Sequence, residues 1–156
     1  MKISLLALAL LGTTAQAADT VNITVRGTLT RPPCVLSTST TLIAEFGEVR
    51  TDQVASASTR PVPVRMVCPA NSSLTVSFSA NSGTHTATVA KTSMSTLGVS
   101  LLWADTNLPA TLDGSTKAYS NLSGNVDISL NAKLIPLGVQ TPGAFSSSMV
   151  MTINYL

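Results

Sequence analysis

The sequence predicts an all-β domain, arranged as a sandwich of two sheets. Apolar and polar residues alternate with a period of two along most of the chain, which is the pattern of strands with one buried face. Helical periodicity does not extend beyond the first residues. Clusters of Ser, Thr, Asn and Gly separate the alternating segments, and short strands divided by such turns are typical of a sandwich.

The N-terminal residues predict an export signal. Lys2 gives a positive start, residues 3–11 are nearly all apolar, and Ala15-Gln16-Ala17 matches a small-residue cleavage site. An uncleaved anchor is the alternative, but the apolar run is far shorter than the roughly 20 residues of a spanning helix. We therefore expect a signal peptide over residues 1–17 and a secreted mature chain.

The charge of the mature chain excludes several partners. Removal of residues 1–17 takes away Lys2 and leaves eight basic and seven acidic residues, a net charge of +1. A net charge this small does not predict binding to nucleic acid or to an anionic membrane. Residues 18–156 suffice for one domain but not for two.

The two cysteines, Cys34 and Cys68, predict an intramolecular disulfide, because an exported chain leaves the reducing cytosol. The chain has one histidine, His85, in a polar segment that we interpret as a solvated loop. A metal site is not expected, nor is any cofactor. Hydrolysis by a nucleophilic serine would need a base near it, and His85 without an acidic neighbour matches no catalytic motif.

Five segments of the body alternate regularly and are expected to be strands. We expect a turn over Pro69–Ser73 and loops over residues 79–95 and 105–123. The alternating members are Val62, Val64, Met66 and Cys68; Leu74, Val76, Phe78 and Ala80; Leu97, Val99, Leu101 and Trp103; Val126, Ile128, Leu130, Ala132 and Leu134; and Phe145, Ser147, Met149, Met151, Ile153 and Tyr155.

An N-terminal segment precedes this body and alternates on its own. Its alternate residues are Val21, Ile23, Val25, Gly27 and Leu29. Pro32-Pro33 follows. Consecutive prolines lack the backbone N–H groups that donate hydrogen bonds between strands, so this strand cannot continue into Cys34. Residues 19–29 could be the first strand of the sandwich or an arm that pairs with another molecule. Gly27 favours the arm slightly, because a glycine weakens an isolated strand but permits close backbone approach.

Taken together, these residues resemble the subunits of chaperone-usher pili of the type 1 and P pilus kind. The resemblance covers the mature chain: the arm with Gly27, Pro32-Pro33-Cys34, Phe46-Gly47-Glu48-Val49 and Cys68. Its most specific part is the C-terminal segment, with a glycine fourteenth from the end, alternating apolar residues and a penultimate tyrosine. The matching residues are Gly143, Phe145, Met149, Met151, Ile153 and Tyr155, followed by Leu156.

The resemblance implies an incomplete immunoglobulin-like sandwich that lacks its seventh strand. A donor strand from a periplasmic chaperone, and then from a neighbouring subunit at the outer-membrane usher, would complete it. Residues 18–30 would be the donor-strand extension and residues 31–156 the pilin domain. Val21, Ile23, Val25, Gly27 and Leu29 would enter the neighbour's groove, and the C-terminal residues Gly143 to Leu156 would line this chain's groove and contact the chaperone.

The resemblance also implies a place in a cell-surface fimbrium, reached through the periplasm. The short domain and the Pro32-Pro33-Cys34 sequence favour a minor or adaptor subunit, with a major rod subunit or a terminator as alternatives. A carbohydrate-binding adhesin is a further alternative, because Trp103 or Tyr119 could stack on a sugar. Trp103 is in phase with Leu97, Val99 and Leu101, however, which favours a core position.

Overall fold

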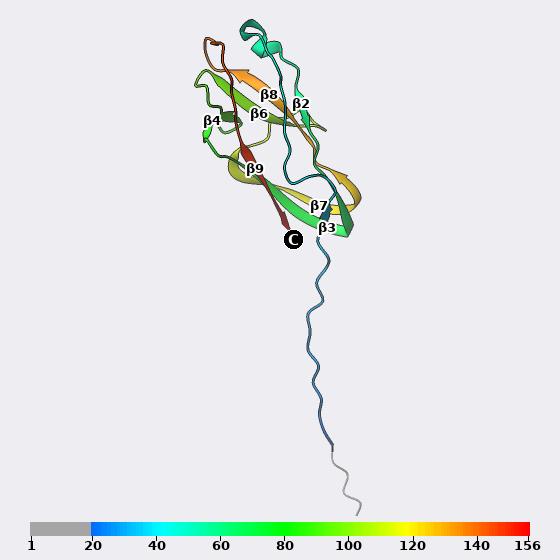
Figure 1. Ribbon diagram of the computed structural model, residues 1–156. Coiled ribbons are helices and arrows are strands. Elements are labelled where there is room, and N and C mark those ends of the chain that lie inside the picture. Colours follow the sequence, from blue (N-terminus) through cyan, green and yellow to red (C-terminus); the bar gives the residue numbers. More distant parts are fainter. Residues whose placement is uncertain (1–19) are drawn as a thin grey trace, which may run out of the picture. The chain divides into compact units, whose positions relative to one another are not determined.

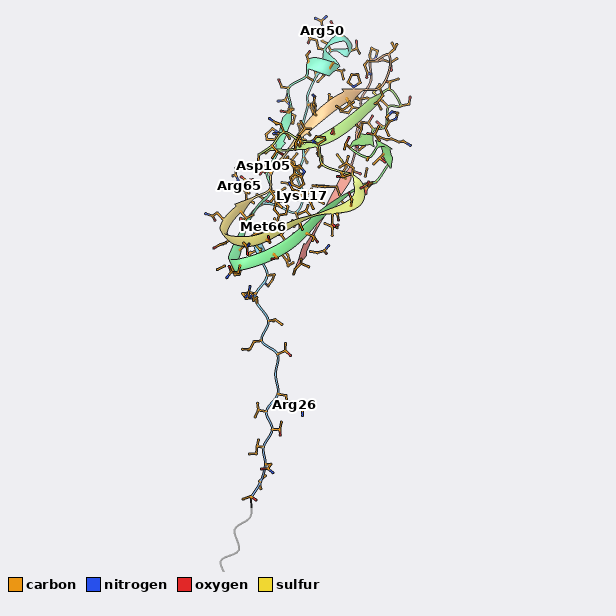
Figure 2. All side chains as sticks on the ribbon, turned by 180° about the vertical axis from the view of Figure 1, so that it is seen from behind. Arg26, Arg50, Arg65, Met66, Asp105 and Lys117 are labelled. Carbon is orange, nitrogen blue, oxygen red and sulfur yellow. A yellow bond between two sulfur atoms is a disulfide. The ribbon has the colours of Figure 1, made fainter. Side chains whose placement is uncertain are left out.

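The computed structural model describes residues 20–156 (Figure 1). The expected signal peptide over residues 1–17 lies outside them, as do Ala18 and Asp19. The chain divides into two units, residues 1–30 and 31–156. In the first unit, residues 20–30 are extended and form no strand or helix, and their side chains, Arg26 among them, project along both sides of the chain (Figure 2).

The second unit contains two antiparallel sheets, and the first is built on the long strand β3 (Arg65–Ala80). Strand β7 (Asp113–Asp127) pairs with one side of β3. The other side is shared by β1 (Val35–Leu36), which pairs near the start of β3, and β9 (Met149–Tyr155), which pairs with its second half. We call this sheet the β3 sheet.

The second sheet has the strand order β2-β8-β6-β5-β4. A short 3-10 helix, η1 (Thr51–Ser56), precedes β2. Within residues 20–156, no helix is long and apolar enough to cross a membrane. The strands are β2 (Arg60–Val62), β4 (Thr84–Thr86), β5 (Val89–Lys91), β6 (Leu97–Trp103) and β8 (Leu130–Pro136).

The core lies between the two sheets and contains the residues whose alternation predicts strands. Its largest fully buried side chains are Met66, Leu74, Val76, Leu112, Leu130 and Leu134. The prediction of an all-β sandwich is therefore confirmed. The predicted disulfide is also present, because Cys34 and Cys68 are bonded, which joins the residue before β1 to β3.

Four expectations about individual elements are wrong. The expected loop over residues 105–123 contains most of β7, whose positions are rich in Ser, Thr and Asn. This strand lies at the border of its sheet with mostly exposed side chains, so it has no apolar alternation to reveal it. The expected loop over residues 79–95 contains β4 and β5, and His85 is exposed within β4.

The other two corrections concern where strands continue and where they are interrupted. The expected turn at Pro69–Ser73 is an irregular stretch inside the single strand β3, where Asn71 takes a positive φ of 61° and the register with β7 shifts. Conversely, the expected strand over residues 126–134 is interrupted. β7 ends at Asp127 in one sheet and β8 begins at Leu130 in the other, with Ile128 buried at the crossing. Period-two burial continues from Val126 to Leu134 across the change of sheet, because it reports the side facing the core and not the sheet in which a residue pairs.

Candidate functional site

Most open strand edges in residues 31–156 carry features that discourage pairing with another strand. Strand β1 has two residues and follows Pro32-Pro33. Strand β2 has three residues, of which Pro61 is one, and β4 also has three. Strand β7 is long, but its register with β3 shifts at three places. Short edges, prolines and bulges all hinder strand addition.

Strand β9 is the exception. It has seven residues that pair in unbroken register with β3, from Leu74 opposite Tyr155 to Ala80 opposite Met149. The segment from Phe145 to Leu156 contains no charged residue and no proline. Of the strand edges in the described residues, β9 thus has the fewest obstacles to a further strand.

The hydrogen bonds of β9 show which of its backbone groups are free. The Asn81 N–H donates to the Ser148 carbonyl, and the Leu156 N–H donates to the Ser73 carbonyl. Backbone groups alternate in direction along a strand, so the even-numbered residues of β9 face β3. The N–H and C=O groups of Met149, Met151, Ile153 and Tyr155 therefore point to the other side, where no strand in the described part of the chain pairs with them.

The side chains of β9 that point toward the core are only partly covered. Met149, Met151 and Ile153 pack against the core but are half-buried, whereas Val76 and Phe78, their neighbours on β3, are 1% and 3% exposed. Tyr155, the next residue in this phase, is 39% exposed. The core is thus well covered beneath β3 and open along β9.

A second segment with half-buried apolar side chains lies between β1 and η1. Leu42 and Ala44 are half-buried, and Phe46, the next alternate residue, is buried. Residues 42–46 nevertheless belong to no strand. The Phe46 and Phe145 ring centroids are 6.3 Å apart, so this segment meets the chain that leads into β9. The Arg60 guanidinium donates to the Phe46 carbonyl (3.2 Å) and holds the segment against β2.

A small pocket of about 60 Å³ lies beside this aromatic pair. Val54, Leu97 and Leu134 contribute apolar walls, and Gly143 and Phe145 border it from the segment before β9. A Cβ atom at Gly143 would meet its nearest neighbour, Met94 Cε, at 3.8 Å, which is an ordinary contact. Gly143 therefore leaves space here without being sterically required.

The predicted site residues fall into two groups. Gly143, Phe145, Met149, Met151, Ile153, Tyr155 and Leu156 all lie in or beside β9 in the second unit. The arm residues belong to the first unit, where Val21, Ile23, Val25 and Leu29 are each at least 82% exposed. Sequence reasoning did not identify Leu42 and Ala44, although their alternation with Phe46 is a signal that could have found them.

A larger concave region, of about 430 Å³, lies elsewhere, between the ends of β6 and β7. It is bordered by Trp103, Tyr119 and the ion pair of Arg65 with Asp127 (3.0 Å). Trp103 is 6% exposed, as its phase predicts, and the Lys117 ammonium lies 3.9 Å from its ring centroid. This arrangement leaves no open Trp103 face for stacking on a sugar. Among residues 20–156, no cluster of His, Cys, Asp and Glu could hold a metal ion.

Comparison with solved structures identifies the class of this fold as that of pilus subunits. The P pilus rod subunit PapA superposes with a TM-score of 0.66 at 18% identity, covering 80% of this chain and all of PapA. A chaperone-usher pilus, studied for rod uncoiling, gives 0.64 at 15% identity, covering 92% of this chain and all of the other. The P pilus adaptor subunit PapF gives 0.58 at 20% identity, covering 80% of this chain and 97% of PapF.

The sequence also matches a family model directly. Residues 23–156 match the model described as fimbrial protein, whereas the search of curated proteins found no match. The chain belongs to the fimbrial protein family, and its fold is that of the pilus subunits PapA and PapF. Proteins of this family form cell-surface fimbriae with neighbouring subunits and are not enzymes.

Proposed function

We propose that this chain is a minor, adaptor subunit that polymerises by donor-strand exchange, with β9 as the acceptor. The observation that carries this proposal is the open side of β9, where four residues present unpaired backbone groups and three half-buried apolar side chains. An added strand would satisfy both at once. Addition of a strand to an exposed edge is a general mode of peptide recognition, of which chaperone–pilin complexes are an established example.

Residues 18–30 supply the matching donor. Val21, Ile23, Val25 and Leu29 lie at alternate positions, so they point to one side of an extended strand. Gly27 has the same phase, and a Cβ atom there would meet nothing within 4 Å in the free arm. In the assembled pilus, these five residues enter the groove of the preceding subunit, and the absence of a side chain at Gly27 allows its backbone to approach closely.

The groove of this chain is the seventh-strand position of the sandwich. In this proposal Phe145, Met149, Met151, Ile153 and Tyr155 form one wall, and Leu42, Ala44 and Phe46 form the other. Support comes from the half-buried state of most of these side chains and from the 6.3 Å between the Phe46 and Phe145 ring centroids. Gly143 borders the pocket at one end, and Leu156 follows Tyr155 at the other. An apolar strip beside an unpaired edge is an aggregation hazard. A periplasmic chaperone therefore occupies the groove first, contacting β9 and Leu156, and the outer-membrane usher catalyses its replacement.

The pocket between Val54 and Phe145 favours a subunit that accepts a further arm over a terminator. It is open, and the apolar side chains of Val54, Leu97 and Leu134 line it together with polar Thr51, Gln140 and Thr141. An incoming apolar residue can be buried against its apolar part. The Pro32-Pro33-Cys34 sequence after the arm supports the adaptor role. A rod subunit must add copies of itself without limit, whereas an adaptor does not. The extent of homopolymer formation therefore distinguishes the two.

The proposal is tested by expressing the mature chain in the periplasm with and without a pilus chaperone and measuring its soluble yield and mass. A soluble one-to-one complex formed only with the chaperone supports a strand-accepting groove. A stable monomer without the chaperone would contradict it and would indicate a complete sandwich.

Deletion of residues 19–29 separates donor from acceptor. This variant should still bind the chaperone but fail to add onto a preceding subunit. An unfolded variant, or one that still polymerises, would contradict the role of the arm. Incubating purified wild-type chaperone–subunit complexes with one another distinguishes an adaptor from a rod subunit. An adaptor forms few or no homopolymers by donor-strand exchange, and a rod subunit forms long ones.

A further inference from the structure

Strand β7 carries a lysine that points into the sandwich. Lys117 pairs with Val76, which is 1% exposed, and directly opposed residues share one face of a sheet. Its ammonium lies 3.9 Å from the ring centroid of Trp103, a residue of the opposite sheet, and 5.0 Å from that of Tyr119. The Lys117 side chain, labelled in Figure 2, therefore extends from β7 toward the opposite sheet.

The backbone of β7 beside Lys117 is available for pairing. Odd-numbered residues of β3 face β9, since Ser73 and Asn81 bond to it, so Val76 faces β7. Lys117 is opposite Val76, and its own backbone groups face β3. Those of Thr116 and Ala118 then point outward, and no strand of the described residues pairs with that side.

The two long open edges of the β3 sheet thus differ in charge. On β9 the side chains that point toward the core are apolar, and the segment 145–156 contains no charged side chain. On β7 the corresponding position holds an ammonium group, which is in neither of the two ion pairs found in the described residues. Lys117 is half-buried and keeps contact with water. A strand such as residues 21–29, which contain no Asp or Glu, would remove that water if placed beside β7 without supplying a carboxylate. Burial of an unpaired charge is strongly unfavourable.

We propose that Lys117 is a specificity-determining residue that prevents strand addition at β7 and so confines it to β9. The arm residues 21–29 from a second copy of this chain could otherwise pair with either of two long edges on one sheet. Inward-pointing charges are a recognised means by which edge strands avoid pairing. The inference rests on the proposed donor-strand function, because it concerns the choice between the two edges.

The test uses the mature chain purified as its chaperone complex, in which β9 is covered. Lys117→Met keeps the length and much of the packing over Trp103 but removes the charge, and Lys117→Gln is a second neutral variant. Lys117→Arg retains the charge. Lys91→Met is the matched control, because Lys91 is exposed on β5, a strand paired on both sides. Mass is measured by light scattering over a range of concentrations, and hydrogen exchange is followed along residues 113–127.

We expect wild type, Lys117→Arg and Lys91→Met to remain one-to-one complexes. The two neutral variants should self-associate at least about tenfold more tightly, with new amide protection in β7, because the desolvation penalty is gone. Neutral variants that stay one-to-one, or that associate with protection elsewhere, would overturn the inference. Failure of wild type to form a chaperone complex is a separate result, which would overturn the proposed function and this inference with it.

Discussion

The aromatic rings of Phe46 and Phe145 lie 6.3 Å apart at an interplanar angle of 51°, and they connect two segments that belong to no strand. Phe46 lies in the segment before η1, and Phe145 lies in the segment that leads into β9. The pair closes the sandwich at one end of the open side of β9. Single substitutions can test how much this aromatic pair stabilises the fold and whether the open side of β9 accepts a strand.

Phe46→Ala should reduce the free energy of unfolding of the complemented subunit by about 3 kcal/mol, because it removes a buried ring and leaves a cavity. Ile43→Ala, in the same segment, is the control, since Ile43 is 73% exposed. Urea unfolding of the chain filled with a donor-strand peptide gives both values. Equal effects of the two substitutions would show that residues 42–46 do not form a wall of the core.

Ile23→Asp should abolish donation by the arm, whereas Thr24→Asp should leave it nearly intact. Both substitutions add the same charge, but only position 23 shares the phase of Val21 and Val25. Burial of four apolar arm residues contributes about 6 to 12 kcal/mol as an upper estimate, and a buried carboxylate would offset much of this. The measurement is the rate at which each variant displaces chaperone from a preceding subunit. Similar rates for both would refute the proposed phase.

On the acceptor side, Met151→Asp and Thr152→Asp form a corresponding pair. Met151 points toward the core and is half-buried, while the Thr152 side chain is exposed on the other face of β9. Met151→Asp should prevent accumulation of the soluble chaperone complex, and Thr152→Asp should permit it. Periplasmic yield of the complex reports the difference, and an unaffected Met151→Asp variant would argue against β9 as the acceptor edge.

The disulfide should be needed for a stable subunit. Cys34 and Cys68 are 34 residues apart in sequence, and a bond closing a loop of this length stabilises a fold by about 3 to 4 kcal/mol in the chain-entropy model. The double variant Cys34→Ser/Cys68→Ser should show this loss in urea unfolding of the complemented chain. A loss below about 1 kcal/mol would indicate that the β1–β3 pairing alone holds the start of the body.

Acid should weaken the fold partly through Asp127. Hydrogen bonds from Ser129 and the ion pair with Arg65 lower the pKa of this carboxyl below its ordinary value of 3.8. Because the folded-state pKa is the lower one, the stabilisation is present above about pH 4 and is lost as the pH falls through the folded-state pKa. Asp127→Asn should therefore reduce stability at neutral pH and flatten this part of the acid transition, measured by thermal unfolding between pH 2 and 7. Arg65→Gln should flatten it less, because the Ser129 bond remains.

Much of the body was predictable from residue alternation. Leu74, Val76 and Phe78, and likewise Leu97, Val99 and Leu101, are buried as their phase predicts. The disulfide followed from two cysteines in an exported chain. The strand β7 was not predictable, because Lys117 occupies one of its inward positions and its outward positions are polar, so no apolar period marks it. The interruption between Asp127 and Leu130 was equally hidden, since burial alternates through it without a break.

The sequence by itself determined which side chains face the core, because a period of two depends only on neighbours along the chain. It also determined, through the resemblance of the C-terminal segment, the family to which the chain belongs. Only the tertiary structure decided which edges are open. Pairing partners come from distant parts of the chain, so the half-covered side of Met151 and Ile153, and the position of Lys117 over Trp103, follow from which strand lies beside which.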